Sequence, residues 1–124
     1  FSEYRIDGGA FGAYTSAFSL AEGIRLVEYR GHDNVLNAEL IKAATVYVDN
    51  TVPQSYLAIS LPRYEDAGGI YVSTWTLFTL SSVDPVVNGV AASVKDIRRR
   101  FGAEEFGVYS AGFIAPASDG EKVL

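Results

Sequence analysis

Residues 44–49 read Ala-Thr-Val-Tyr-Val-Asp, and residues 56–61 read Tyr-Leu-Ala-Ile-Ser-Leu. In both stretches the side chains alternate between two faces, and β-branched and aromatic residues are frequent, as is typical of half-buried β-strands. The segment between them, residues 50–54, is short and contains Pro53. Pro62 follows the second stretch and ends its pairing, because proline has no backbone N–H to donate. We therefore predict two neighbouring strands joined as an antiparallel hairpin.

Further strand-like segments lie on both sides of this pair. Residues 2–7 alternate and run into Asp-Gly-Gly at 7–9, a strong turn signal, so the second arm of a first hairpin is expected at 13–20. Another strand is expected at 24–30. Residues 70–80 form a long β-rich run with large apolar groups on both faces, so its pattern does not decide which face is buried.

The apolar spacing changes to three and four after Ser82. Asp84 can cap a helix, and Pro85 suits its first turn because its missing N–H costs nothing there. Apolar residues then recur at helical spacing, at Val86, Val90, Val94, Ile97 and Phe101. Gly102 suits the C-terminal cap, and residues 103–114 are expected to form a second, shorter helix before a tail.

The order of these elements predicts the fold class. An N-terminal hairpin and an antiparallel sheet come first, two helices follow, and β–helix–β alternation is missing, so we predict an α+β fold with both C-terminal helices on one face of the sheet. A chain of 124 residues with 48% hydrophobic content suits a single domain over residues 1–124. The apolar stripe is too extensive for a lone surface helix, so we expect a dimer interface at Val90, Val94, Ile97 and Phe101.

Composition and charge exclude several classes of function. The net charge of −5 argues against nucleic-acid binding through an excess of positive charge, and Arg98 to Arg100 are interpreted as a solvated helix end. Cysteine and methionine are absent, which excludes disulfides and sulfur ligation of metals. No apolar run reaches the roughly 20 residues that cross a bilayer, so we expect no membrane partner. Since the chain begins at Phe1 without a methionine, we also expect an upstream start or processing.

No group of residues predicts an enzyme, a metal site or a cofactor. His32 is the only histidine, and its setting in Gly-His-Asp-Asn favours a polar loop over catalysis. Adjacent carboxylates such as Glu65 and Asp66 are explained by solvation. For Trp75 we prefer the interpretation as a core or interface anchor to that as a base-stacking platform.

The order of elements resembles a known family. The resemblance rests on residues 44–48 and 56–62, a Gly-Gly loop at 68–69, the long aromatic strand around Trp75 and the amphipathic helix from Asp84. Together these are similar to the coat proteins of small single-stranded RNA bacteriophages. The resemblance implies a virion structural protein that forms a symmetric dimer, assembles into an icosahedral shell around single-stranded RNA, and does so in the cytoplasm of a bacterial host.

The resemblance also implies which residues face RNA. These positions fall on Thr45, Tyr47, Tyr56, Ser60 and Trp75, together with Ala43, Asp49 and Ala58. The last three are basic in well-known members of the family, so we expect weak RNA contact of low specificity, made by aromatic stacking.

Two other functions compete with the coat-protein interpretation. A small-ligand-binding or lyase-like α+β domain would enclose an aromatic-lined pocket between its sheet and helix. An interaction module of a larger cellular assembly is the third possibility. Particle size separates the first two, because a coat protein forms dimers or very large particles, whereas a ligand-binding domain stays small.

Overall fold

A computed structural model describes residues 1–116 and 120, and all regular structure in that part of the chain is β. The longer strands are β1 (Ser2–Ile6), β3 (Gly23–Gly31), β4 (Lys42–Val48), β5 (Gln54–Ile59), β6 (Arg63–Asp66), β7 (Gly69–Val72) and β8 (Leu77–Val83). Four two-residue strands complete the set: β2 (Gly12–Ala13), β9 (Arg98–Arg99), β10 (Gly107–Val108) and β11 (Phe113–Ile114). The prediction of an α+β fold with two C-terminal helices is therefore wrong, because the fold is all-β.

Backbone contacts divide the chain into two compact units. The first unit comprises Phe1–Val52 and Pro85–Ala92, and the second comprises Pro53–Asp84 and Ser93–Leu124. Two compact units can unfold together or separately, so the single domain predicted over residues 1–124 stays a prediction.

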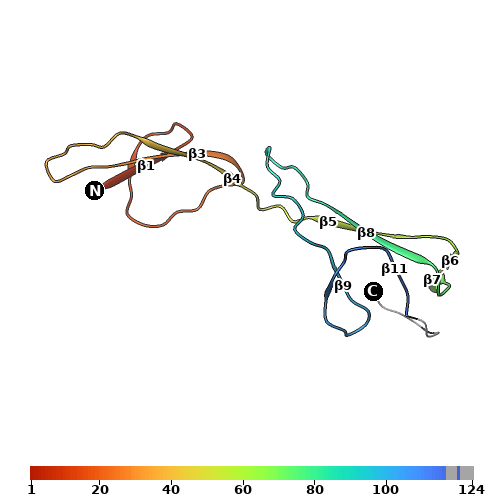
Figure 1. Ribbon diagram of the computed structural model, residues 1–124. Coiled ribbons are helices and arrows are strands. Elements are labelled where there is room, and N and C mark those ends of the chain that lie inside the picture. Colours follow the sequence, from red (N-terminus) through yellow and green to blue (C-terminus); the bar gives the residue numbers. More distant parts are fainter. Residues whose placement is uncertain (117–119, 121–124) are drawn as a thin grey trace. The chain divides into compact units, whose positions relative to one another are not determined.

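The first unit is built on an antiparallel sheet in the order β2-β1-β3-β4, whose long strands run side by side in Figure 1. The predicted turn after β1 is confirmed: Asp7 and Gly8 have φ angles of +53° and +75°, and the Gly9 N–H donates to the Ile6 carbonyl at 3.0 Å. The expected second arm at 13–20 is wrong, because the returning strand is only Gly12–Ala13. The strand expected at 24–30 is confirmed as β3.

The predicted hairpin between residues 44–49 and 56–61 is wrong, although both segments are strands. β4 pairs with β3, and β5 pairs with β8 in the second unit. Alternation of side chains identifies a strand and its two faces, but the backbone groups that choose a neighbour are the same in every strand. The segment at 50–54 therefore connects the two units and is not a hairpin loop.

Residues 85–92 return to the first unit as a tight turn in place of the predicted helix. Val87 and Val90 exchange both backbone hydrogen bonds at 3.0 Å, and between them Asn88 and Gly89 have φ angles of +50° and +79°. Two successive positive φ angles define the turn type that Asn-Gly favours and that a helix excludes. Val90 is 5% exposed, and the Ala92 N–H donates to the Asp49 carboxylate at 2.7 Å, which ties this segment to the end of β4.

The second unit contains a three-stranded antiparallel sheet, β11-β8-β5, and two short ribbons, β6-β7 and β9-β10. Phe78 is 9% exposed and stacks on Phe113 at 5.5 Å between ring centroids. The rings of Phe101 and Tyr109 contact Phe113 edge-on. The guanidinium of Arg99 lies 4.0 Å from the centre of the Phe113 ring. Two members of this cluster, Tyr109 and Phe113, lie where the second helix was predicted, and Arg98 and Arg99 form β9 in place of a solvated helix end.

The long strand predicted at 70–80 is interrupted by a turn. β7 ends at Val72, the Thr76 N–H donates to the Ser73 carbonyl at 3.1 Å, and β8 begins at Leu77. Thr76 is fully buried, and its hydroxyl donates to the Pro62 carbonyl at 2.6 Å. The undecided face is now resolved: the face of β8 that carries Phe78 is the inner one.

Candidate functional site

One face of the first sheet, here called the ionic face, is covered by paired charges. Arg5 donates to both carboxylate oxygens of Glu28 at 2.6 and 2.8 Å, and Arg30 donates to Glu3 at 2.6 Å. Both guanidinium carbons lie close to the ring centre of Phe11, at 4.7 and 4.9 Å. The antiparallel register of β1 and β3 places each arginine directly opposite its carboxylate. These arginines are therefore neutralised within the unit and hold β1, β3 and the turn together.

His32 extends the ionic face at the end of β3. Its Nε2 lies 3.0 Å from the Glu3 carboxylate, and its ring stacks on Phe1 with centroids 4.5 Å apart. The hydrogen bond with His32, and then the one from Arg30, lower the pKa of Glu3 below its ordinary value. The sequence assigned His32 to a polar loop, and the structure gives it a partner in an ion-pair network.

Acid is expected to destabilise the first unit before the second. The hydrogen bond from Arg5 lowers the pKa of Glu28, and the Leu26 N–H and then Arg25 lower the pKa of Asp7. Carboxylates whose pKa is lower in the folded state stabilise it fully above their unfolded values of about 4, and this stabilisation is lost as the pH falls through the folded values. Amide hydrogen exchange between pH 7 and pH 3 should show β3 losing protection at higher pH than β8.

The matched variant for this prediction is Glu3→Gln, which keeps the size of the side chain and removes its titration. It should be less stable than the wild type at pH 7 and should have a flatter pH dependence in the first unit. Parallel loss of protection in both units would contradict the prediction.

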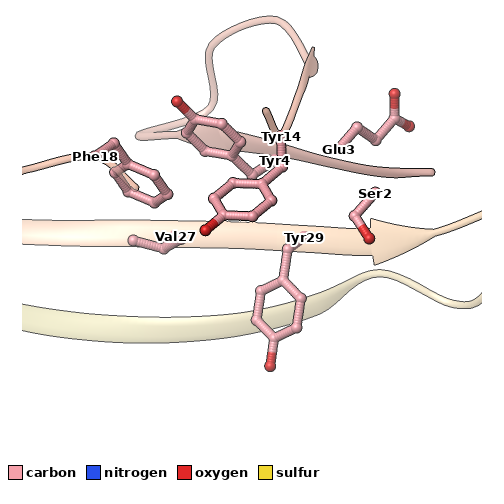
Figure 2. Close-up of a pocket in the computed structure, with 7 residues that line it drawn as sticks. All are labelled: Ser2, Glu3, Tyr4, Tyr14, Phe18, Val27 and Tyr29. Carbon is pink, nitrogen blue, oxygen red and sulfur yellow. The ribbon is translucent and has the colours of Figure 1, made fainter. Parts of the chain in front are cut away.

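The opposite face of the same sheet, here called the aromatic face, carries a cluster of rings. Tyr4 and Phe18 stack with centroids 4.3 Å apart and planes 6° from parallel, and Tyr14 meets both edge-on at 6.2 and 6.4 Å. Figure 2 shows these three rings gathered together, with Val27 and Tyr29 coming from the strand beside them. They surround an open apolar pocket of about 270 Å³ lined by Ser2, Glu3, Tyr4, Tyr14, Phe18, Val27 and Tyr29.

The segment that carries two of these rings is fixed by backbone contacts. The Tyr14 N–H donates to the Ser2 carbonyl at 2.8 Å. Arg25 donates to the carbonyls of Ala21 and Glu22 at 2.9 and 2.7 Å, which holds the far end of the segment against β3. The pocket is thus formed by the paired strands β1 and β3 together with a loop held in a fixed position. Sequence reasoning missed it, although Tyr14 and Phe18 were a visible aromatic pair close to the first turn.

The residues expected to face RNA are divided between the two units. Thr45 and Tyr47 lie on β4, on the same side of the sheet as the ionic face, since they pair with Leu26 and Ile24. The other three belong to the second unit: Tyr56 on β5, Ser60 just after it, and Trp75 in the turn before β8.

Hydrogen bonds and exposure show which of those three side chains can reach a partner. The Leu77 N–H donates to the Ser60 hydroxyl at 2.9 Å, so this hydroxyl is used in strand pairing. Tyr56 donates to the Gln54 side chain, and Trp75 is 73% exposed. The aromatic rings are therefore accessible, but the five residues do not form one site within either unit.

The residues expected at a dimer interface are divided between the two units. Val90 is buried inside the first unit, whereas Val94, Ile97 and Phe101 belong to the second. The helix that would have placed all four on one stripe is not formed in the described part of the chain, and the dimer interface at these residues stays a prediction.

Residues 1–116 and 120 contain no group of three or more His, Asp or Glu side chains that could hold a metal ion. The same part of the chain includes no helix with the length and apolar character needed to cross a bilayer. No protein-family model, curated protein or solved structure matches this chain.

Proposed function

We propose that this chain is a structural subunit that assembles with further copies of itself. The observation that carries the proposal is the number of large apolar side chains left in water on both sheets. In the part of the chain that the structure describes, Phe78 and Val90 are the buried apolar side chains. Tyr47, Tyr56, Leu61, Trp75, Val83 and Ile114 are among those that are exposed. Burying these side chains against another copy would supply apolar contacts that each small unit does not make alone.

A virion coat is the specific form of assembly that we propose. The helices by which coat subunits of RNA phages clasp each other are not part of this proposal, because the fold is all-β. Weak RNA contact remains part of it, with Tyr47, Tyr56 and Trp75 supplying accessible rings. The neutralised arginines of the ionic face support weak contact, since they offer little free charge to phosphates.

Sedimentation velocity is expected to show dimers or larger species at about 10 µM. If the larger species are shells, negative-stain microscopy will show uniform particles. Nuclease-treated particles should then retain a raised 260/280 nm absorbance ratio, and Trp75→Ala should lower it by removing stacking of about 1–3 kcal/mol per base. A monomer at every concentration up to the solubility limit would overturn the assembly proposal.

Binding of a small apolar ligand is the second candidate function, and the aromatic pocket is the observation that favours it. A ligand-binding protein would stay monomeric and gain thermal stability with a small aromatic probe such as toluene.

A further inference from the structure

The loop between β3 and β4 displays apolar side chains that nothing in its own unit covers. Val35 and Leu36 lie at its tip and are 77% and 71% exposed. We call residues 33–41 the apolar finger. Single exposed aliphatic residues are common, but two adjacent ones at the tip of a loop form an apolar knob.

The finger is rigid for a loop of its length. The Asp33 carboxylate accepts hydrogen bonds from the N–H groups of Val35 and Asn37 at 2.9 and 2.8 Å, and from the Asn37 side chain at 2.8 Å. At its base, Glu39 donates its N–H to the Gly31 carbonyl and accepts the Gly31 N–H. The backbone that carries the two apolar side chains is therefore held in place before any partner arrives, which reduces the entropy cost of binding.

Leu36 is held in an unfavourable backbone conformation. Its φ angle is +67°, in the left-handed region that bulky side chains seldom adopt. Glycine or asparagine would suit the position better for folding alone. A leucine retained there, in water, indicates a role for its side chain outside the unit.

The aromatic pocket matches this knob in size and chemistry. A cavity of about 150 Å³ accommodates benzene. The aromatic pocket has a volume of about 270 Å³, which leaves room for two aliphatic side chains. Glu3 is the one acidic residue among those lining the pocket, and its carboxylate lies on the ionic face, where it is bonded to Arg30 and His32. The pocket therefore suits an apolar insert better than a charged one.

We propose that the apolar finger of one copy inserts into the aromatic pocket of another. This inference rests on the proposed function, self-assembly, and names the segments that make the contact. The apolar finger and the aromatic pocket belong to the same unit, so every copy carries both halves of the contact. Two copies can exchange fingers about a two-fold axis and cover both surfaces, or successive copies can link head-to-tail into a closed ring or an open filament.

Cysteine cross-linking tests the contact directly, because the chain has no native cysteine. Leu36→Cys protein is mixed with Tyr14→Cys protein that carries a mass tag, and the mixture is oxidised. The mixed disulfide should be the main product. The control replaces Leu36→Cys by Val86→Cys, an equally exposed position in the same unit, and should yield under a tenth as much. A mixed product no greater than the control would overturn the proposal.

Leu36→Asn separates the interface from the fold. Asparagine tolerates the left-handed conformation, so the variant should unfold at the same temperature as the wild type or higher. Its dissociation constant for self-association should nevertheless rise about 10- to 100-fold, because one buried leucine is lost. An assembling wild type with an unchanged Leu36→Asn constant would overturn the finger contact and leave the proposed function standing. A monomeric wild type would overturn the proposed function itself.

Discussion

Phe78→Ala is expected to lower the free energy of unfolding of the second unit by about 3–5 kcal/mol, the usual cost of removing a buried phenylalanine. Among the described residues of that unit, Phe78 is the buried apolar side chain, and its ring stacks on Phe113, whose ring the Arg99 guanidinium contacts. A unit with so small a core has few other contacts to compensate. Urea denaturation followed by the fluorescence of Trp75, the sole tryptophan, measures the loss.

The control for Phe78→Ala is Tyr56→Ala. Tyr56 lies on the same pair of strands, but on the exposed face. At a protein concentration low enough to keep the chain monomeric, its replacement should change the free energy of unfolding by about 0.5 kcal/mol or less. Equal effects of the two substitutions would show that the inner and outer faces of β5 and β8 are assigned incorrectly.

Val90→Asp is expected to cost the first unit several kcal/mol. Val90 is 5% exposed, and a carboxylate at that position would be buried without a partner. Its main effect should be to detach residues 85–92 from the sheet, which releases the Asp49–Ala92 hydrogen bond. Hydrogen exchange should show lost protection at Val90 and Ala92 and in the adjoining part of β4.

Val86→Asp is the matched control, because it makes the same substitution four residues earlier at a side chain that is 71% exposed. We expect it to change stability by about 0.5 kcal/mol or less. The pair also tests the fold itself, since Val86 and Val90 would share one face of the helix first expected here. Similar large losses for both variants would support that helix against the turn.

The sequence predicted local features of the first unit well. Alternation in residues 2–7 separated Tyr4 and Ile6 from Glu3 and Arg5, and the structure places the latter pair on the ionic face. The Asp-Gly pair after β1 predicted its turn, because those residue types tolerate positive φ angles. These features depend on neighbouring residues alone.

The helix predicted from Asp84 failed because apolar spacing was given more weight than turn chemistry. Valines at spacings of four fit a helical face, but they also favour strands, and Asn88-Gly89 in their midst is a hairpin signal. Gly107 and Gly112 likewise argued against the second helix. The pair Asn88-Gly89 therefore indicated a turn, although the spacing of the valines also fitted a helix.

The candidate site was predictable only in part. An aromatic-lined pocket was expected in the alternative function, but between a sheet and a helix. The structure forms it from β1, β3 and the loop that carries Tyr14 and Phe18. Nothing in a pattern of alternating residues shows where the nine-residue loop at 14–22 will be held, because that depends on hydrogen bonds donated by Arg25 and on the one that the Ser2 carbonyl accepts from Tyr14.

The sequence by itself determined that β1, β3, β4 and β5 are extended, where the first turn lies, which residues share a face of β1 and β4, and that sulfur chemistry is excluded. Each of these follows from the stereochemistry or the composition of the residues concerned. Only the tertiary structure decided that β4 pairs with β3 and β5 with β8, that residues 85–92 rejoin the first unit, and that the aromatic pocket and the apolar finger belong to one unit. Those outcomes depend on long-range pairing, for which every strand offers the same backbone donors and acceptors, so packing and the ion pairs between strands select the partner.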